Sequence, residues 1–383
     1  MRTIDSRPDH ASGGGGDRRS TGRPLGVGIV GLSASGGWAA AAHLGALAHV
    51  EGMELRALAT SSQQFAQAAA AVYGVPGHGS VEALVQAGDI DLLVVAVKVA
   101  RHRDIVLPAL RAGIPVLSEW PLALDARQAG EMARAAGKTR AFVGLQGRSS
   151  PTVRWLADLI STGHVGEVLS ATVVAASAEW GGPVSERHRY TLDKDSGATM
   201  LTIAFGHAID LVSMLLGELQ DVSATLATRR TMVPLAAGGG MTPMSAHDQI
   251  AISGTLPGGA ILSVHHRGAT ATGPRFSLRI DGTQGTLEVT CAGHPHLGPL
   301  SVRGTRGGSA LETLALPAGY DRYPQLAGTA SHTLAHAYSA IRDDLLYDTH
   351  VAPDFAHAVK RHRLLDAIVA SAASGQRVRL PAS

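Results

Sequence analysis

A chain of 383 residues is too long for one ordinary hydrophobic core, so its length predicts two domains. Its 45% apolar and 17% charged residues are typical of a globular protein, and the 33 basic and 31 acidic residues leave a formal net charge of only +2. This charge argues against a nucleic-acid-binding surface, and no apolar run is long enough to predict a membrane span. The single cysteine, Cys291, excludes an internal disulfide and indicates a reducing compartment.

The first residues, 1–23, are rich in glycine and offer little to bury, so we expect a disordered tail. Arg18 and Arg19 resemble the start of an export signal. The sequence that follows them is typical of a strand and a glycine turn rather than of a cleavable apolar segment, which favours a cytoplasmic protein. The two predicted domains then cover residues 24–146 and 147–383.

A strand, a glycine-rich turn and an alanine-rich helix follow the tail. Gly31, Ser33 and Gly36 occupy the three fixed positions of a G-x-G-x-x-G turn, with serine in the middle position. In such a turn the pyrophosphate of a dinucleotide rests on backbone N–H groups at the helix start, so Ala34 and Ser35 are expected contacts as well. An ordinary strand–turn–helix built from small residues is the alternative.

The second predicted strand ends in three hydroxyl side chains, Thr60, Ser61 and Ser62. NAD-binding proteins usually place a carboxylate about twenty residues after the glycine turn, where it binds the ribose 2′-hydroxyl. Three hydroxyls without a carboxylate can bind a 2′-phosphate instead. We therefore expect NADP as the preferred cofactor, with NAD as the alternative.

Strands and helices continue to alternate, and the run DIDLLVVAVKV is typical of a central parallel strand covered on both faces. The repeated units predict an α/β fold with a Rossmann-type, doubly wound parallel sheet, in which ligands lie beyond the carboxyl ends of the strands. Val97, Lys98 and His102 follow one strand end, and Glu119 and Trp120 follow the next. We expect all five residues in the cofactor site.

After the first domain the pattern changes to shorter alternating strands, and TLPGGA and DGTQGT between them predict hairpins. This predicts a C-terminal α+β domain with an open, largely antiparallel sheet. The segment FAHAVKRHRLLDAIVASA predicts a closing amphipathic helix, on which Lys360, Arg361 and Arg363 are expected to form a solvated face.

The order of these motifs resembles the Gfo/Idh/MocA family of two-domain, nicotinamide-dependent oxidoreductases, which act mostly on sugars and cyclitols. The resemblance is carried by GIVGLSASG, by the apolar strand followed by His102, by EWP and by FGHAIDLVSMLLGEL. The segments GLSASGGWAAAAH, SEWPLAL, VGLQGRSSP, TIAFGHAID and PAGYD resemble the Gal80-like branch, which includes a regulator without a dehydrogenase role. The resemblance implies that the C-terminal sheet forms a wall of the substrate cleft and the interface of a homodimer or homotetramer.

Two departures from the family pattern affect the expected chemistry. The family usually has E-K-P and D-x-G-x-H, whose lysine, aspartate and histidine handle the proton of the reacting hydroxyl. Here Trp120 stands in place of the lysine and Ile203 in place of the aspartate, so only His207 is left. We expect Trp120 to be a packing or stacking wall beside nicotinamide or substrate, and any proton transfer must use other residues.

Three residues are candidates for that transfer. His207 and Asp210 share one face of an apolar helix, so His207 is the candidate general acid or base and Asp210 would orient it. A buried His–Asp pair that satisfies only itself is the alternative. Tyr190 is a candidate if a nearby cation, such as Arg187, lowers its pKa. Lys98 can reach the nicotinamide or the substrate oxygen, or bind a cofactor phosphate.

The expected partner is a small, sugar-like substrate, and no metal is expected. The candidate substrate-binding residues are Trp120, Gln146, Arg148, Trp180, Tyr190, His207 and Asp210. His265 and His266 would point to opposite faces of a strand, and His294 and His296 have no cysteine or acidic cluster beside them. The sequence predicts an oxidoreductase that interconverts a secondary alcohol and a ketone. A sensor that uses the same cleft without turnover, or an enzyme with a net non-redox reaction, would have the same signature.

Overall fold

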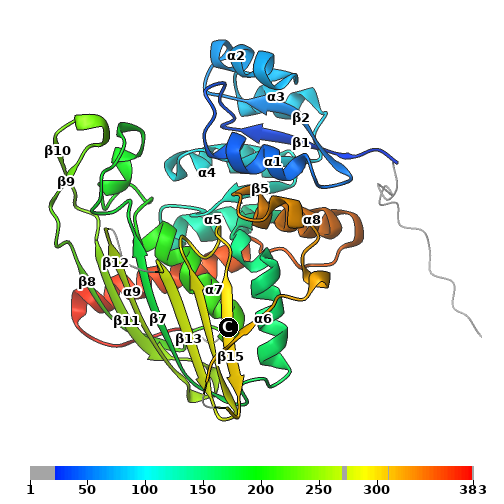
Figure 1. Ribbon diagram of the computed structural model, residues 1–383. Coiled ribbons are helices and arrows are strands. Elements are labelled where there is room, and N and C mark those ends of the chain that lie inside the picture. The colour runs from blue at the N-terminus through cyan, green and yellow to red at the C-terminus, as the bar shows by residue number, and fades with distance from the viewer. Residues whose placement is uncertain (1–21, 270–273, 309, 382–383) are drawn as a thin grey trace, which may run out of the picture.

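The computed structural model describes residues 22–269, 274–308 and 310–381, and two sheets organise this part of the chain (Figure 1). Nearly all of the predicted tail lies outside the described residues. Among the described residues, no helix combines the length and the apolar character that crossing a bilayer requires.

The first sheet has six parallel strands in the order β3-β2-β1-β4-β5-β6. Its strands are β1 (Leu25–Val30), β2 (Met53–Ala59), β3 (Gly77–His78), β4 (Leu92–Val95), β5 (Val116–Glu119) and β6 (Ala141–Gly144). β4 is buried along its whole length, as a central strand covered on both faces requires. The predicted doubly wound Rossmann-type sheet is therefore confirmed.

Helices cover both faces of this sheet, and three of them begin at polar capping residues. They are α1 (Gly45–Leu47), which continues the helical turn Ala39–Leu44, and α2 (Gln63–Tyr73), α3 (Val81–Ala87), α4 (His102–Arg111) and α5 (Ala126–Ala136). Ser62, Ser80 and Asp125 each accept a backbone N–H at the start of a helix, which satisfies one of its free donors.

The second sheet has nine strands in the order β16-β15-β14-β13-β7-β12-β11-β8-β17, and only β7 and β12 pair in parallel. The strands are β7 (Val168–Ser177), β8 (Asp221–Ala227), β11 (Gln249–Thr255), β12 (Ile261–Gly268), β13 (Phe276–Gly282), β14 (Gly285–Cys291), β15 (Ser301–Arg306), β16 (Glu312–Leu314) and β17 (Val378–Arg379). A separate hairpin joins β9 (Met232–Pro234) and β10 (Met241–Pro243). The predicted open, largely antiparallel sheet and both hairpin turns are confirmed.

Side chains alternate between the two faces of this sheet, as a strand period of two requires. On β12 every second residue is buried, so His266 faces the core and His265 faces outward. The prediction that these two histidines cannot chelate one ion together is confirmed.

Four helices pack on and between the sheets: α6 (Pro151–Ser161), α7 (Gly206–Leu216), α8 (Ser331–Tyr347) and α9 (Phe355–Ser374). α8 returns to the N-terminal half, where it packs against α1, and α9 lies between α5 and β8 (Figure 1). Because α9 is covered on two sides, the predicted solvated face is wrong for Arg361, whose side chain is fully buried against Asp210 and Glu218. Lys360 and Arg363 are exposed.

Candidate functional site

A pocket of about 820 Å³ opens at the carboxyl ends of β1, β2 and β4. This position is where a doubly wound sheet binds its ligand. Seven of the predicted cofactor residues line the pocket: Gly31, Ser33, Ala34, Thr60, Ser61, Val97 and Lys98. Arg101, Glu82 and Asp104 line it as well and were not predicted.

Contacts within the protein fix the conformation of the glycine turn. Gly31 has a φ of +100°, and a β-carbon there would collide with the carbonyl oxygen of Ala96 at the end of the neighbouring strand. The hydroxyls of Ser33 and Ser35 lie 2.9 Å apart, and the phenol of Tyr73 donates to the Ser33 carbonyl over 2.7 Å. These contacts fix the backbone at the predicted pyrophosphate position.

The three hydroxyls at the end of β2 do not all face the pocket. Thr60 donates its hydroxyl to the Ser62 carbonyl over 2.9 Å, and Ser62 Oγ accepts the Phe65 N–H at the start of α2. Both hydroxyls therefore stabilise the turn and the helix start. Ser61 is exposed and lines the pocket, so it is the hydroxyl best placed to bind a ribose substituent.

His102 does not line the cofactor groove, but it contacts the strand end that does. Burial lowers the pKa of its imidazole, so the ring is neutral. Nε2 lies 3.0 Å from the Val97 carbonyl, and Nδ1 lies 3.2 Å from both the Leu122 carbonyl and Ser118 Oγ, so both ring nitrogens have partners in the fold. His102 thus holds the strand end that carries Val97 and Lys98.

The EWP segment joins the two halves of the molecule. Glu119 accepts from His43 Nε2 over 2.9 Å, and His43 Nδ1 lies 2.7 Å from the phenol oxygen of Tyr338 on α8. Trp120 is 5% exposed; its indole N–H donates to the Thr202 carbonyl over 2.7 Å, and its ring lies 4.6 Å from that of His362. These contacts fit a packing role, and neither residue lines the groove.

His207 stacks flat on His296, with ring centroids 3.7 Å apart and an interplanar angle of 9°. Burial lowers the pKa of His207 to about 4, although the charges of Glu119 and Asp210 oppose the shift. Burial also lowers the pKa of His296 well below its usual value. Both rings are therefore neutral at neutral pH, and His207 is in the form that accepts a proton.

Asp210 does not orient His207, which corrects the predicted pairing. It instead accepts from His357 over 2.6 Å, from Arg361 over 3.3 Å and from Arg148 over 3.4 Å. Burial opposes ionisation of Asp210, but the hydrogen bond from His357 and the two arginine charges outweigh it and hold the pKa well below its usual value. Asp210 is the anion at the centre of a buried cation cluster.

The crossover between the two halves reaches the His207–His296 stack. A β-carbon on Gly147 would lie 3.2 Å from the His296 side chain, and the neighbouring Gln146 is buried with its Oε1 unpartnered among the described residues. Prediction missed the role of His296, because a histidine 89 residues beyond His207 gives no local signal of contact.

The segment Glu186–Leu192 brings Tyr190 and Arg187 to the groove. Lys98 Nζ lies 4.3 Å from the centre of the Tyr190 ring, a cation–π contact. Burial raises the pKa of Tyr190 and outweighs the opposing charge of Arg187, so the condition under which Tyr190 was a candidate for proton transfer is not met. Arg187 lies against Gly37, where a β-carbon would collide with its guanidinium. Trp180 donates to the Thr191 carbonyl over 3.0 Å and so holds the segment in place.

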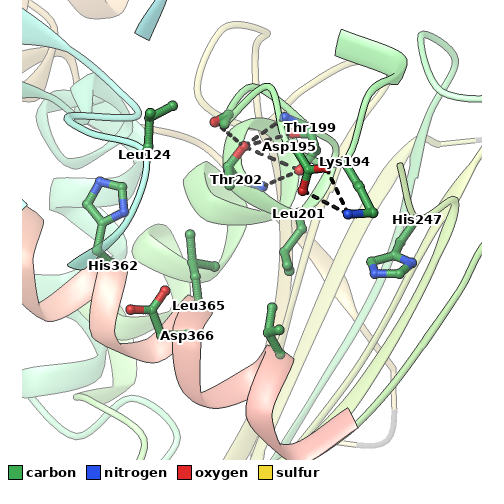
Figure 2. Close-up of a pocket in the computed structure, with 12 residues that line it drawn as sticks. Leu124, Lys194, Asp195, Thr199, Leu201, Thr202, His247, His362, Leu365 and Asp366 are labelled. Carbon is green, nitrogen blue, oxygen red and sulfur yellow. Dashed lines mark hydrogen bonds and ion pairs between the residues drawn. The ribbon is translucent and has the colours of Figure 1, made fainter. Parts of the chain in front are cut away.

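A second pocket, of about 390 Å³, lies between α9 and the segment before α7 (Figure 2). Figure 2 shows Leu201 and Leu365 on its walls and the Lys194–Asp195 ion pair, with a 2.8 Å contact, at its edge. Thr202 and His362, the two residues that Trp120 contacts, line this pocket. It is a smaller cavity than the groove, and none of the predicted site residues lines it.

Comparison with known proteins gives two family matches that follow each other along the chain. The oxidoreductase family with an NAD-binding Rossmann fold, GFO_IDH_MocA, matches residues 25–146. The C-terminal domain of Gal80p matches residues 151–291.

Individual relatives fall into the same two groups. The dehydrogenase aclE of Aspergillus oryzae is 34% identical over 45% of this chain and 49% of its own length. The galactose/lactose metabolism regulatory protein GAL80 of Saccharomyces cerevisiae is 27% identical over 70% of this chain and 66% of its own length. A super-repressor mutant of that Gal80p gives a TM-score of 0.83 at 22% identity, over 93% of this chain and 98% of the other. Levoglucosan dehydrogenase in complex with NADH and levoglucosan gives a TM-score of 0.78 at 22% identity, over 94% of this chain and 100% of the other.

The fold and the groove define a two-domain protein of the nicotinamide dinucleotide-binding class, in which a Rossmann domain faces an open sheet. The first domain matches the GFO_IDH_MocA oxidoreductase family and the second domain matches the C-terminal domain of Gal80p.

Proposed function

We propose that this protein is a nicotinamide-dependent oxidoreductase that interconverts a secondary alcohol and a ketone on a sugar-like molecule. The observation that carries the proposal is the neutral, buried His207, which stacks on His296 where the crossover between the two domains meets α7. The dehydrogenases among the relatives, one of them in a complex with NADH and a sugar derivative, support the same reaction class.

In this proposal, separate groups of residues bind the cofactor, accept the proton and bind the substrate. The glycine turn and the strand ends hold the dinucleotide, whose nicotinamide, when bound, accepts or supplies a hydride. A ring nitrogen of His207, which burial keeps unprotonated at neutral pH, accepts the hydroxyl proton as the carbonyl forms. The unpartnered Gln146 Oε1 accepts a hydrogen bond from a second substrate hydroxyl.

The preferred cofactor in this proposal is NADP(H). Three observations support it: β2 ends without a carboxylate, the Ser61 hydroxyl is exposed in the groove, and Arg101 lines the same groove. We expect NADPH to bind more tightly than NADH in a fluorescence titration, and we expect Arg101→Ala to weaken NADPH about tenfold while NADH is unaffected. Tighter binding of NADH by the unmodified protein would overturn this preference.

A non-catalytic sensor or regulator is the competing function. The specific observation in its favour is that Trp120 occupies the usual lysine position and is buried with its indole N–H committed to the Thr202 carbonyl. The Gal80-type second domain supports it too.

One assay separates the two functions. The protein is mixed with NADP⁺ or NAD⁺ and a panel of sugars and cyclitols, and the absorbance of the reduced nicotinamide is followed. We expect turnover, and we expect His207→Ala to lower kcat by roughly 100-fold or more because it removes the proton acceptor. His49→Ala, which removes an exposed histidine of the first domain, is the matched control. Tight cofactor binding without turnover on any substrate would favour the sensor.

A further inference from the structure

Asp321, His332 and His336 form a compact cluster outside both pockets. Asp321 lies in the segment that follows β16, and the two histidines lie one turn apart at the start of α8. Across the described ranges, this is the one group of three histidine, cysteine or acidic residues whose ligand atoms all lie within 4.8 Å of one another. The histidine pairs weighed from the sequence, at 265–266 and 294–296, lie elsewhere.

The donor atoms of this cluster converge on one point. His332 Nε2 lies 3.0 Å from Asp321 Oδ1, and His336 Nε2 lies 3.1 Å from the same oxygen. Histidines at positions i and i+4 share a helix face, which brings their rings together. A tetrahedral zinc ion with bonds of about 2.0–2.2 Å spaces its ligand atoms about 3.3–3.5 Å apart, so small side-chain adjustments would admit the ion.

Asp321 and His336 are partly buried, and the pKa of each lies below its ordinary value. Burial lowers the pKa of His336, which keeps its imidazole neutral, although Asp321 opposes the shift. Burial opposes ionisation of Asp321, but hydrogen bonds from His332, from the Tyr323 backbone N–H and from His336 outweigh it and keep the carboxyl group ionised. The three side chains are 8–15% exposed, so an ion can enter from solvent.

We propose that Asp321, His332 and His336 bind a divalent transition-metal ion, with zinc as the best match and water in the fourth position. Two imidazole nitrogens and one carboxylate oxygen are a ligand set that suits zinc, whereas magnesium and calcium require oxygen ligands. Direct hydrogen bonds from both histidines to Asp321 are the metal-free alternative.

The ion would stabilise the segment that carries His296. Thr333, which lies between the two histidines on α8, donates its hydroxyl to the His296 carbonyl over 2.9 Å, and His296 stacks on His207. A metal ion that links Asp321 to the start of α8 would therefore stabilise the structure beside His207. It would not contact the substrate. The metal site stands independently of the proposed reaction.

The test measures zinc binding directly. Tag-free full-length protein is stripped with a chelator and titrated with Zn²⁺ alone in a calorimeter. We expect a single ion per chain, a higher Tm with zinc, and an affinity that falls at least about tenfold in His336→Gln and in Asp321→Asn. His265→Gln, which removes an exposed histidine outside the cluster, should bind zinc as the unmodified protein does.

Co²⁺ gives a second readout that does not depend on stability. Bound in a tetrahedral site it absorbs visible light strongly, and this band should be present in the unmodified protein and in His265→Gln. It should be absent from His332→Gln, His336→Gln and Asp321→Asn, whose circular dichroism spectra verify that they are folded. The proposal is overturned if the unmodified protein binds no zinc at micromolar concentrations, or if folded cluster variants bind it unchanged.

Discussion

Arg187 reaches from the second domain to the glycine turn of the first, where its guanidinium lies against Gly37. A guanidinium is well suited to phosphate oxygens, and this position is where the dinucleotide pyrophosphate is expected. Removing one charge-assisted hydrogen bond costs about 1.5–3 kcal/mol, so we expect Arg187→Ala to weaken dinucleotide binding roughly 10- to 100-fold.

The affinity of Arg187→Ala can be measured by titrating the fluorescence of NADPH. Arg189→Ala is the matched control, because Arg189 lies on the same segment, is half exposed and pairs with Glu186 over 3.8 Å. Equal affinities for the two variants would remove Arg187 from the cofactor site.

Asp210 is the second residue with a defined energetic role. Its carboxylate is the shared partner of His357, Arg361 and Arg148, and Arg361 is fully buried. Replacing it by asparagine removes the anion that these three cations share and leaves Arg361 with Glu218 as its remaining carboxylate partner. Breaking a buried ion pair destabilises a protein by up to about 3–5 kcal/mol. We expect that loss for Asp210→Asn in urea unfolding.

A surface ion pair supplies the comparison for Asp210. Glu288→Gln breaks a 3.4 Å contact with Arg303, which is 52% exposed, and should cost less than about 1 kcal/mol. If the two variants unfolded at the same urea concentration, the buried cluster would not contribute to stability.

At the scale of elements, the strands and helices could be predicted because each carries its own periodic pattern. The apolar run of β4, the glycine turn after β1 and the alternation in β12 are local signals. The partners of Asp210 could not be predicted, because His357 and Arg361 lie 147 and 151 residues further along the chain.

The corrections at the site also concern contacts that the local sequence pattern does not show. The hydroxyls of Thr60 and Ser62 were expected to bind the cofactor, but the turn and the start of α2 use them. The local sequence shows which polar side chains a turn contains, but it does not show which of them hydrogen-bond to the backbone and are unavailable to a ligand. Burial, which sets the pKa of Tyr190, likewise depends on packing between distant segments.

The outward face of the second sheet carries apolar side chains that the fold leaves uncovered. Val174 on β7 is 43% exposed and Ile261 on the neighbouring β12 is 51% exposed. We propose that two copies of the chain pair through this face, since a flat, partly apolar sheet face is typical of a protein interface.

Light scattering after size exclusion tests this pairing. Val174→Glu places a charge in the middle of the face and should shift the protein to a monomer. Val72→Glu alters a more exposed valine, on α2 in the first domain, and should leave the assembly unchanged. A monomeric unmodified protein, or a dimer that survives Val174→Glu, would contradict the proposed interface.

At the scale of the whole molecule, buried polar contacts as well as apolar packing join the two halves. Trp120 links the end of β5 to Thr202, the His43 chain links Glu119 to α8, and α9 packs on both sheets' helices and strands. Several histidines are buried in this interior with lowered pKa values, so the stability of the molecule depends on pH.

The direction of that dependence follows from three buried histidines. Burial lowers the pKa of His207 and His362 to about 4 and of His266 to about 3, whereas an unfolded histidine titrates near 6.5. As the pH falls below 6.5 the unfolded chain binds protons that the folded chain excludes, so stability is lost down to about pH 4 and is fully present above 6.5. These three groups together contribute at most about 4 kcal/mol per pH unit to the slope, and His102 and His296, whose pKa values burial also lowers, add to it. Urea unfolding at pH 7.5, 6.5 and 5.5 checks this, and His266→Gln should reduce the slope by up to about 1.4 kcal/mol per pH unit; a midpoint that stays constant or rises with acidity would show that these histidines are not neutral in the folded protein.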